Sequence, residues 1–253
     1  MIEQQILLKK LGCCGKSKDM ISSKKLKALQ KYIDIIEANK GKTISDIYES
    51  IVGENHSHYK KGASGLIIEN LLGLENNGSP LADLVDLGVE IKVLPIQLHN
   101  LKVKEPTQIK MINFIEVAKE TWETAKIRDK IETIFWIVYG VPRDATSKKN
   151  ESQDRYILLD WFIDAPNQQK QTVFKQDWEL IQSYIIKGEG DKLSCSMGTY
   201  IEPKTKGKNN KDLTDAPDGK GGTTKVRRRA FYFKKNYTNN NVITELDLSV
   251  LRK

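Results

Sequence analysis

The sequence predicts a mixed α/β (α+β) fold in which a central β-sheet is flanked by helices. Apolar, β-branched runs typical of buried strands cluster in the middle of the 253-residue chain. Stretches with apolar residues at helical spacing lie before and after these runs. We find no internal repeat, and we expect an N-terminal extension with one helix over 1–40, followed by one large domain over 41–253.

Helix-capping residues and glycines separate the expected helices and strands along the chain. Ser22 precedes a first amphipathic helix that ends before Gly41. Further helices are expected over 43–52, over 66–72, over 122–130 and from Phe174 to Ile185. Expected strands cover 87–94, 109–117, 131–139, 155–163 and 229–235. The glycine- and lysine-rich stretch 207–224 predicts a mobile loop.

Charge and cysteine content suggest a partner and a compartment. The net charge is +8, and basic residues concentrate between Pro203 and Lys235 beside an aromatic run, which favours a nucleic-acid partner. Three cysteines, two of them adjacent, are a poor disulfide framework, so a reduced, cytoplasmic setting is expected. No apolar run approaches a membrane span, and the N-terminus carries no secretory signal pattern.

The stretch from Asp83 to Lys92 is the most informative part of the chain. Glu90 and Lys92 share one face of an expected strand, because side chains alternate along it. Asp83 and Glu90 could hold a hard cation through oxygen, and Lys92 could orient or activate a water molecule. The alternative is an edge strand with a solvated Glu/Lys pair, since short motifs recur by chance.

Five blocks in order make the chain resemble the MutH-like endonucleases, a family in the PD-(D/E)xK nuclease superfamily. That family includes a mismatch-repair nicking enzyme and type II restriction endonucleases that cut at GATC. The matching blocks are Lys61–Gly73, Asp83–Ile96, Trp122–Lys130, Gln176–Glu179 and Arg229–Thr238. They cover roughly Gly41 to Thr238, whereas the first forty residues have no obvious counterpart.

The resemblance implies a restriction-endonuclease-like sheet and an active site that uses Mg²⁺. It makes Asp83, Glu90 and the Ile91 carbonyl the metal ligands and Lys92 the group that acts on the water. Glu69 matches an additional acidic residue, with a surface salt bridge as the alternative. Lys61 and Lys130 match positions near the active centre, with phosphate contact as the alternative. Asp86 is off the matching spacing and is expected to face solvent.

The same resemblance places the DNA-contacting residues in the C-terminal part, with 203–229 as a basic DNA-contacting loop region. Lys204 matches a base-reading lysine, and Tyr232 matches an aromatic residue that senses adenine methylation. A core tyrosine is the alternative for Tyr232, although alternation places it opposite Phe231 and Phe233. The remaining expected DNA contacts are Arg227, Arg228, Arg229 and Lys234.

Together these features predict an Mg²⁺-dependent type II restriction endonuclease that acts on double-stranded DNA, with GATC as its expected site. It could act as a homodimer on DNA, beside a companion DNA methyltransferase for the same site. One alternative is a repair enzyme that nicks one strand when a MutL-type partner is present. The other is a non-catalytic DNA-binding module, against which the intact Asp83, Glu90 and Lys92 argue.

Overall fold

The computed structural model describes residues 22–53, 63–74, 82–144 and 155–252. The contacts divide the chain into two compact units. Unit 1 contains the described residues of Met1–Glu105, Glu132–Ala165 and Asn239–Lys253. Unit 2 contains Pro106–Ile131 and Pro166–Thr238. The mixed α+β architecture confirms the predicted fold class.

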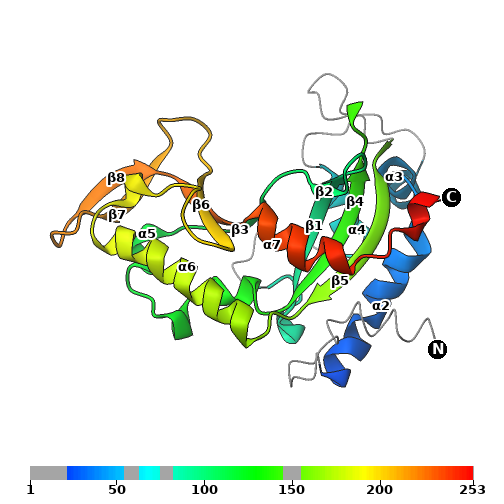
Figure 1. Ribbon diagram of the computed structural model, residues 1–253, viewed down its shortest axis with the longest axis horizontal. Helices are drawn as coiled ribbons and strands as arrows, with labels where there is room; N and C mark the ends of the chain where they lie inside the picture. The colour runs from blue at the N-terminus through cyan, green and yellow to red at the C-terminus, as the bar shows by residue number, and fades with distance from the viewer. Residues whose placement is uncertain (1–21, 54–62, 75–81, 145–154, 253) are drawn as a thin grey trace. The chain divides into compact units, whose positions relative to one another are not determined.

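Unit 1 is built on a mixed four-stranded sheet in the order β2-β1-β4-β5 (Figure 1). The strands are β1 (Glu90–Gln97), β2 (Lys102–Val103), β4 (Ile134–Val141) and β5 (Ile157–Asp164). Strand β1 runs parallel to β4, with Glu90 opposite Ile134, and the other two pairings are antiparallel. The central strand β4 is almost wholly buried, as its continuous apolar sequence predicts.

Three helices cover one face of this sheet: α2 (Ser23–Asn39), α3 (Ile44–Val52) and α4 (Ala63–Leu71). Helix α2 begins at Ser22, whose side chain accepts the Lys25 N–H, and α3 begins with a capping box between Thr43 and Asp46. Helix α2 spans most of the segment that the sequence analysis separated as 1–40. It packs into unit 1 together with strands from the rest of the chain.

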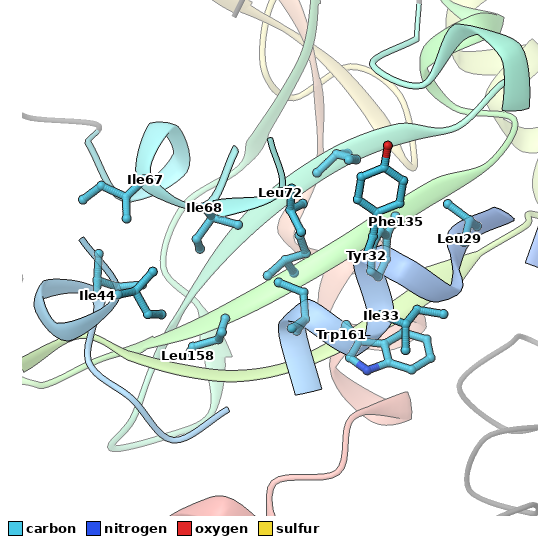
Figure 2. Close-up of a cluster of buried hydrophobic side chains, with 14 of the residues drawn as sticks. Leu29, Tyr32, Ile33, Ile44, Ile67, Ile68, Leu72, Phe135, Leu158 and Trp161 are labelled. Carbon is cyan, nitrogen blue, oxygen red and sulfur yellow. The ribbon is translucent and has the colours of Figure 1, made fainter. Parts of the chain in front are cut away.

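The core of unit 1 lies between these helices and the sheet, and Figure 2 shows side chains from both layers directed toward one another. Helix α2 contributes Leu29 and Ile33, and strands β4 and β5 contribute Phe135 and Trp161. Trp161 also donates a 2.6 Å hydrogen bond from Nε1 to Glu37 on α2. Each large apolar side chain buried here stabilises the fold by about 1.5–3 kcal/mol.

Unit 2 contains an antiparallel three-stranded sheet in the order β3-β9-β6, with helices α5 (Phe114–Val117) and α6 (Gln168–Ile186). Its strands are β3 (Thr107–Met111), β6 (Ile201–Thr205) and β9 (Arg229–Phe233). Phe174 of α6 packs against Phe233, and both contact the ring of Tyr237. This aromatic cluster identifies the Phe233 face of β9 as the one that faces the core.

The stretch predicted as a mobile loop, 207–224, was wrongly assigned. It contains most of a β-hairpin made by β7 (Leu213–Pro217) and β8 (Thr223–Arg227). Ala216 and Val226 are buried on the same side of the hairpin. Near the turn, a Cβ added to Gly188 at the end of α6 would lie 2.3 Å from the Asp218 carbonyl group, so the backbones approach too closely for a side chain.

Other sequence predictions were wrong in part. The strand expected over 109–117 ends at Met111, because Asn113 caps α5 by accepting the Glu116 N–H. The helix expected over 122–130 is two short 3₁₀ turns, η2 (Trp122–Thr124) and η3 (Arg128–Lys130). Strands β2 and β6 and helix α7 (Lys235–Asn241) were not predicted from the sequence.

Short 3₁₀ turns complete the described elements: η1 (Val85–Leu87), η6 (Gly190–Lys192), η7 (Ile243–Glu245) and η8 (Ser249–Arg252). Among the helices that the structure describes, none is both long enough and apolar enough to cross a membrane.

Candidate active site

Asp83 is held beside the first residues of β1 by the turn that leads into this strand. The chain passes through η1 and then Gly88, which adopts a left-handed conformation with φ of 57°. This turn returns the backbone so that the Leu84 N–H donates to the Val89 carbonyl. The Asp83 carboxylate then accepts the Ile91 N–H at 2.9 Å. Asp83 and Ile91 are therefore in direct contact, although they are eight residues apart in the sequence.

Glu90 and Lys92 share one face of β1, as the alternation predicted. Val89 and Ile91 lie on the other face, in the core of unit 1. The Lys92 Nζ lies 2.5 Å from Glu90 Oε1, and only 1% of the Glu90 surface is exposed. A solvated Glu/Lys surface pair does not describe this arrangement, because a buried carboxylate is retained only with a partner.

Glu69 on α4 belongs to the same electrostatic group. Burial raises the pKa of the Glu69 carboxyl, and the negative charges of Asp83 and Glu90 raise it further, whereas Lys92 lowers it. Glu69 forms no ion pair with any residue in the described ranges, so the surface salt bridge considered from the sequence is absent there. Glu69 is thus electrostatically coupled to Asp83, Glu90 and Lys92 within unit 1.

These residues fit a magnesium ion in the chemistry of their donors. Among the described residues, no three His, Cys, Asp or Glu side chains converge as a preformed metal site. Mg²⁺ commonly takes one or two carboxylates and completes its shell with water and substrate phosphate. Asp83, held beside the start of β1, and Glu90, the first residue of this strand, offer those two carboxylates.

The raised pKa of Glu69 predicts an effect on thermal stability. The folded state binds the Glu69 proton more tightly than the unfolded chain does. The stabilisation that this proton gives to the folded state is complete below the ordinary carboxyl pKa of 4.5. It is lost as pH rises through the raised pKa of Glu69. At pH 7.5 without metal, Glu69→Gln should therefore raise Tm, measured by calorimetry in EDTA.

Adding Mg²⁺ should raise the Tm of the wild type more than that of Glu69→Gln, because the cation offsets repulsion that the variant lacks. Glu49→Gln is the matched control, since Glu49 is an exposed acid on α3 in the same unit. Equal Tm values for Glu69→Gln and wild type in EDTA would contradict the proposed clustering of charge.

The structure describes only one of the two lysines expected near the active centre. Lys61 lies outside the described residues. Lys130 is buried in η3 of unit 2. Burial lowers the pKa of the neighbouring Lys110, and the charges of Lys130 and Lys126 lower it further. No role was predicted for Lys110 from the sequence, because its position on a short strand carries no motif.

Tyr232 and Lys204 lie on one face of the three-stranded sheet of unit 2. The Lys204 Nζ lies 5.6 Å from the centre of the Tyr232 ring. Tyr232 pairs with Gln108 on one side and with Glu202 on the other. Phe233 is on the opposite, core-facing side, so the predicted alternation is correct. Even so, Tyr232 is only 8% exposed.

The basic residues expected to contact DNA at and beside β9 differ in their surroundings: Arg227 and Arg228 are exposed, Arg229 is buried, and Lys234 contacts the backbone of another loop. Arg227 is exposed, and the exposed Arg228 donates from Nε to Asp212 at 2.6 Å. Arg229 requires a correction: it is 4% exposed and donates to the Asp191 carbonyl, so its side chain is part of the interior. The Lys234 side chain, just after β9, donates to the Gly198 carbonyl at 2.7 Å and thereby connects the end of β9 to the loop before β6.

This division predicts different salt responses for two neighbouring arginines. Removing a single phosphate contact should lower the slope of log Kd against log salt by about one unit. Arg227→Gln should do so in DNA titrations performed in Ca²⁺. Arg229→Gln should leave the slope unchanged and lower Tm, because it removes a buried hydrogen bond. An equal decrease of the slope in both variants would show that the buried Arg229 also reaches phosphate.

The described fold and the residues at β1 define an α+β protein with a nuclease-type arrangement. One acid and one lysine lie on a strand of a mixed sheet, and a second acid is held beside the start of that strand. A family model described as "DNA mismatch repair enzyme MutH" matches residues 72–177, which include Asp83, Glu90 and Lys92. The mismatch repair protein MutH of Haemophilus ducreyi is 31% identical over 180 residues, covering 70% of this chain and 76% of the relative.

Two other relatives give the same result. The MutH protein of Shewanella woodyi is 30% identical over 178 residues, which is 70% of this chain and 74% of the relative. A MutH protein of Escherichia coli is 28% identical over 178 residues, which is 70% of this chain and 75% of the relative. The chain belongs to the MutH family, and the resemblance drawn from its sequence blocks is confirmed.

Proposed function

We propose that this protein is an Mg²⁺-dependent endonuclease that hydrolyses phosphodiester bonds of double-stranded DNA at a short specific site. The observation that carries the proposal is the arrangement on β1. Asp83 contacts the Ile91 amide, and Glu90 pairs with Lys92 at the same end of the strand. Membership of the MutH family supports the DNA substrate.

In this proposal, Asp83, Glu90 and the Ile91 carbonyl bind the metal. Bound Mg²⁺ supplies positive charge to offset the charge that develops on the phosphate and on the leaving 3′ oxygen. Lys92 orients the attacking water and stabilises the negative charge that forms on it. Glu69 adds a third carboxylate beside them and helps to hold a proton or a water molecule near Lys92. The burial of Glu90 keeps this polar group away from bulk solvent.

We further propose GATC as the target. One candidate use is type II restriction, with both strands cut by a homodimer and the host site protected by a companion methyltransferase. The second candidate is mismatch-repair nicking, which the name shared by the relatives favours. A chain with one set of catalytic residues nicks a single strand directly, whereas a double-strand cut needs two chains or two visits.

Plasmids carrying GATC in unmethylated, hemimethylated and fully methylated form distinguish these uses. With pure protein and Mg²⁺, restriction yields linear unmethylated plasmid and mapped ends at GATC without any addition. Repair nicking yields a nicked circle from hemimethylated plasmid, and this product increases strongly with a MutL-type partner and ATP. Binding without any cut, under every condition, would favour the non-catalytic DNA-binding module.

Tyr232 offers a finer test of the same proposal. A methyl group on adenine N6 adds bulk in the major groove and removes one donor direction. If Tyr232 contacts that base, Tyr232→Ala should narrow the difference in cleavage rate between methylated and unmethylated sites. Tyr232→Phe keeps the ring and serves as the control, because the contact between Tyr232 and Gln108, at 3.5 Å, is a long one. An unchanged difference in Tyr232→Ala would remove this residue from methylation sensing.

A further inference from the structure

Glu202 on β6 is a buried acid that the proposed active site does not use. It is 8% exposed, and it forms no hydrogen bond or ion pair with the residues that the structure describes. Some described side-chain polar atoms are fully buried and have no hydrogen-bond partner, but the Glu202 oxygens are not among them. The Glu202 carboxylate oxygens therefore remain accessible to water. A carboxylate kept in this position without a partner is costly, which suggests that a ligand completes it.

The sheet of unit 2 places Glu202 in a row of polar side chains. Residues paired across antiparallel strands share a face, so Gln108, Tyr232 and Glu202 lie side by side across β3, β9 and β6. Lys204, two residues further along β6, extends over the Tyr232 ring from the same face. One surface therefore offers an amide, a phenol, a carboxylate and an ammonium.

The surroundings of Glu202 control its charge. Burial raises the pKa of the Glu202 carboxyl, whereas the positive charges of Lys204 and Lys234 lower it. These lysines compensate the charge from a distance, because neither forms an ion pair with Glu202. The acceptor oxygens therefore stay available to a hydrogen-bond donor.

We propose that Glu202 reads the DNA site by accepting a hydrogen bond from the exocyclic amino group of a base in the major groove. Cytosine N4 and adenine N6 are the two base amino groups exposed in that groove, and a glutamate accepts well from cytosine N4. Phosphates, by contrast, offer no donor to a carboxylate. The inference rests on the proposed DNA endonuclease function and adds a specificity-determining residue to it.

The test uses the DNA site mapped by plasmid cleavage and removes one amino group at a time. Each cytosine is replaced by a pyrimidine without the 4-amino group, and each adenine by a purine without the 6-amino group. Wild type should lose about 10-fold or more in single-turnover cleavage and in affinity measured in Ca²⁺ at one of these positions. The position affected shows whether the donor is cytosine or adenine.

Two variants at Glu202 connect that loss to this residue. Glu202→Met keeps the length and removes the acceptor, so it should be weakened on the natural site and show no further loss with the decisive analogue. Glu202→Gln keeps one acceptor oxygen and should retain part of the sensitivity. Glu179→Gln, an exposed acid on α6, is the control for the change in charge.

Three results would overturn the assignment of Glu202. Wild type could tolerate every analogue, Glu202→Met could remain as sensitive as wild type, or Glu202→Met could weaken all DNA sequences equally. The last result would mean that Glu202 only adjusts the local charge. Absence of cleavage by wild type would instead count against the nuclease function. Binding of GATC duplexes that carry each analogue, measured in Ca²⁺, would then still decide the role of Glu202.

Discussion

Asp83→Asn and Glu90→Gln should each reduce DNA cleavage in Mg²⁺ by at least about 100-fold. Both changes keep the shape of the side chain and remove the negative charge that a cation needs. Because Asp83 accepts the Ile91 amide and Glu90 is buried against Lys92, the amide variants also preserve most packing. DNA binding measured in Ca²⁺ should change little.

Asp86→Asn is the matched control for these variants. Asp86 lies in the same stretch, in η1, and is exposed, as the sequence predicted. Its substitution should leave the cleavage rate within about twofold of wild type. Near wild-type cleavage by Asp83→Asn, with intact folding shown by calorimetry, would remove Asp83 from the proposed active site.

Asp177→Ala should cause the largest loss of stability among the single substitutions considered for unit 2. The buried Asp177 carboxylate accepts the N–H groups of Thr199, Tyr200 and Ile201 at 2.6–2.8 Å. It thereby fixes the start of β6, the strand that carries Glu202 and Lys204. Loss of three charge-assisted hydrogen bonds should cost about 3 kcal/mol or more.

Urea unfolding followed by circular dichroism measures this cost through the shift of the midpoint at constant slope. Asp177→Asn can still accept from backbone amides and should lose less stability than Asp177→Ala. Glu179→Gln, an exposed position on the same helix, should be nearly neutral. An Asp177→Ala protein as stable as wild type would mean that the backbone of β6 is held by other contacts.

Sequence patterns predicted the principal elements of unit 1 because these elements signal themselves locally. Ser22 and Thr43 mark helix starts, and the continuous apolar runs of β4 and β5 predict strands that are buried in a sheet. The start of β1 was displaced from Leu87 to Glu90, because Gly88 permits a left-handed turn that the apolar pattern does not reveal.

Unit 2 was harder to predict, since its elements depend on contacts between distant residues. The hairpin β7–β8 has few apolar residues, and its docking depends on the close approach of Gly188 to Asp218. Strand β6 is fixed at its start by Asp177 rather than by its own sequence. Arg229 was expected to contact DNA as part of the basic C-terminal region, but the alternation along β9 directs its side chain inward.

The sequence named Asp83, Glu90 and Lys92 together, and the structure brings these three residues to one end of β1. Glu202 was missed although it lies two residues before Lys204. Its signal was available in the sequence: once Lys204 is placed on a strand, alternation puts Glu202 on the same face. No local pattern could show that its carboxylate is buried without a partner among the described residues.

Single-turnover cleavage of a duplex with one GATC site tests the central claim most directly. Both strands are labelled at their ends, and the pure protein is compared with Glu90→Gln in Mg²⁺ and in EDTA. The proposed function predicts cleavage at GATC by wild type in Mg²⁺ only, in one strand or in both. Cleavage that persists in EDTA, or that Glu90→Gln performs as fast as wild type, would contradict an Mg²⁺-dependent active site at Asp83, Glu90 and Lys92.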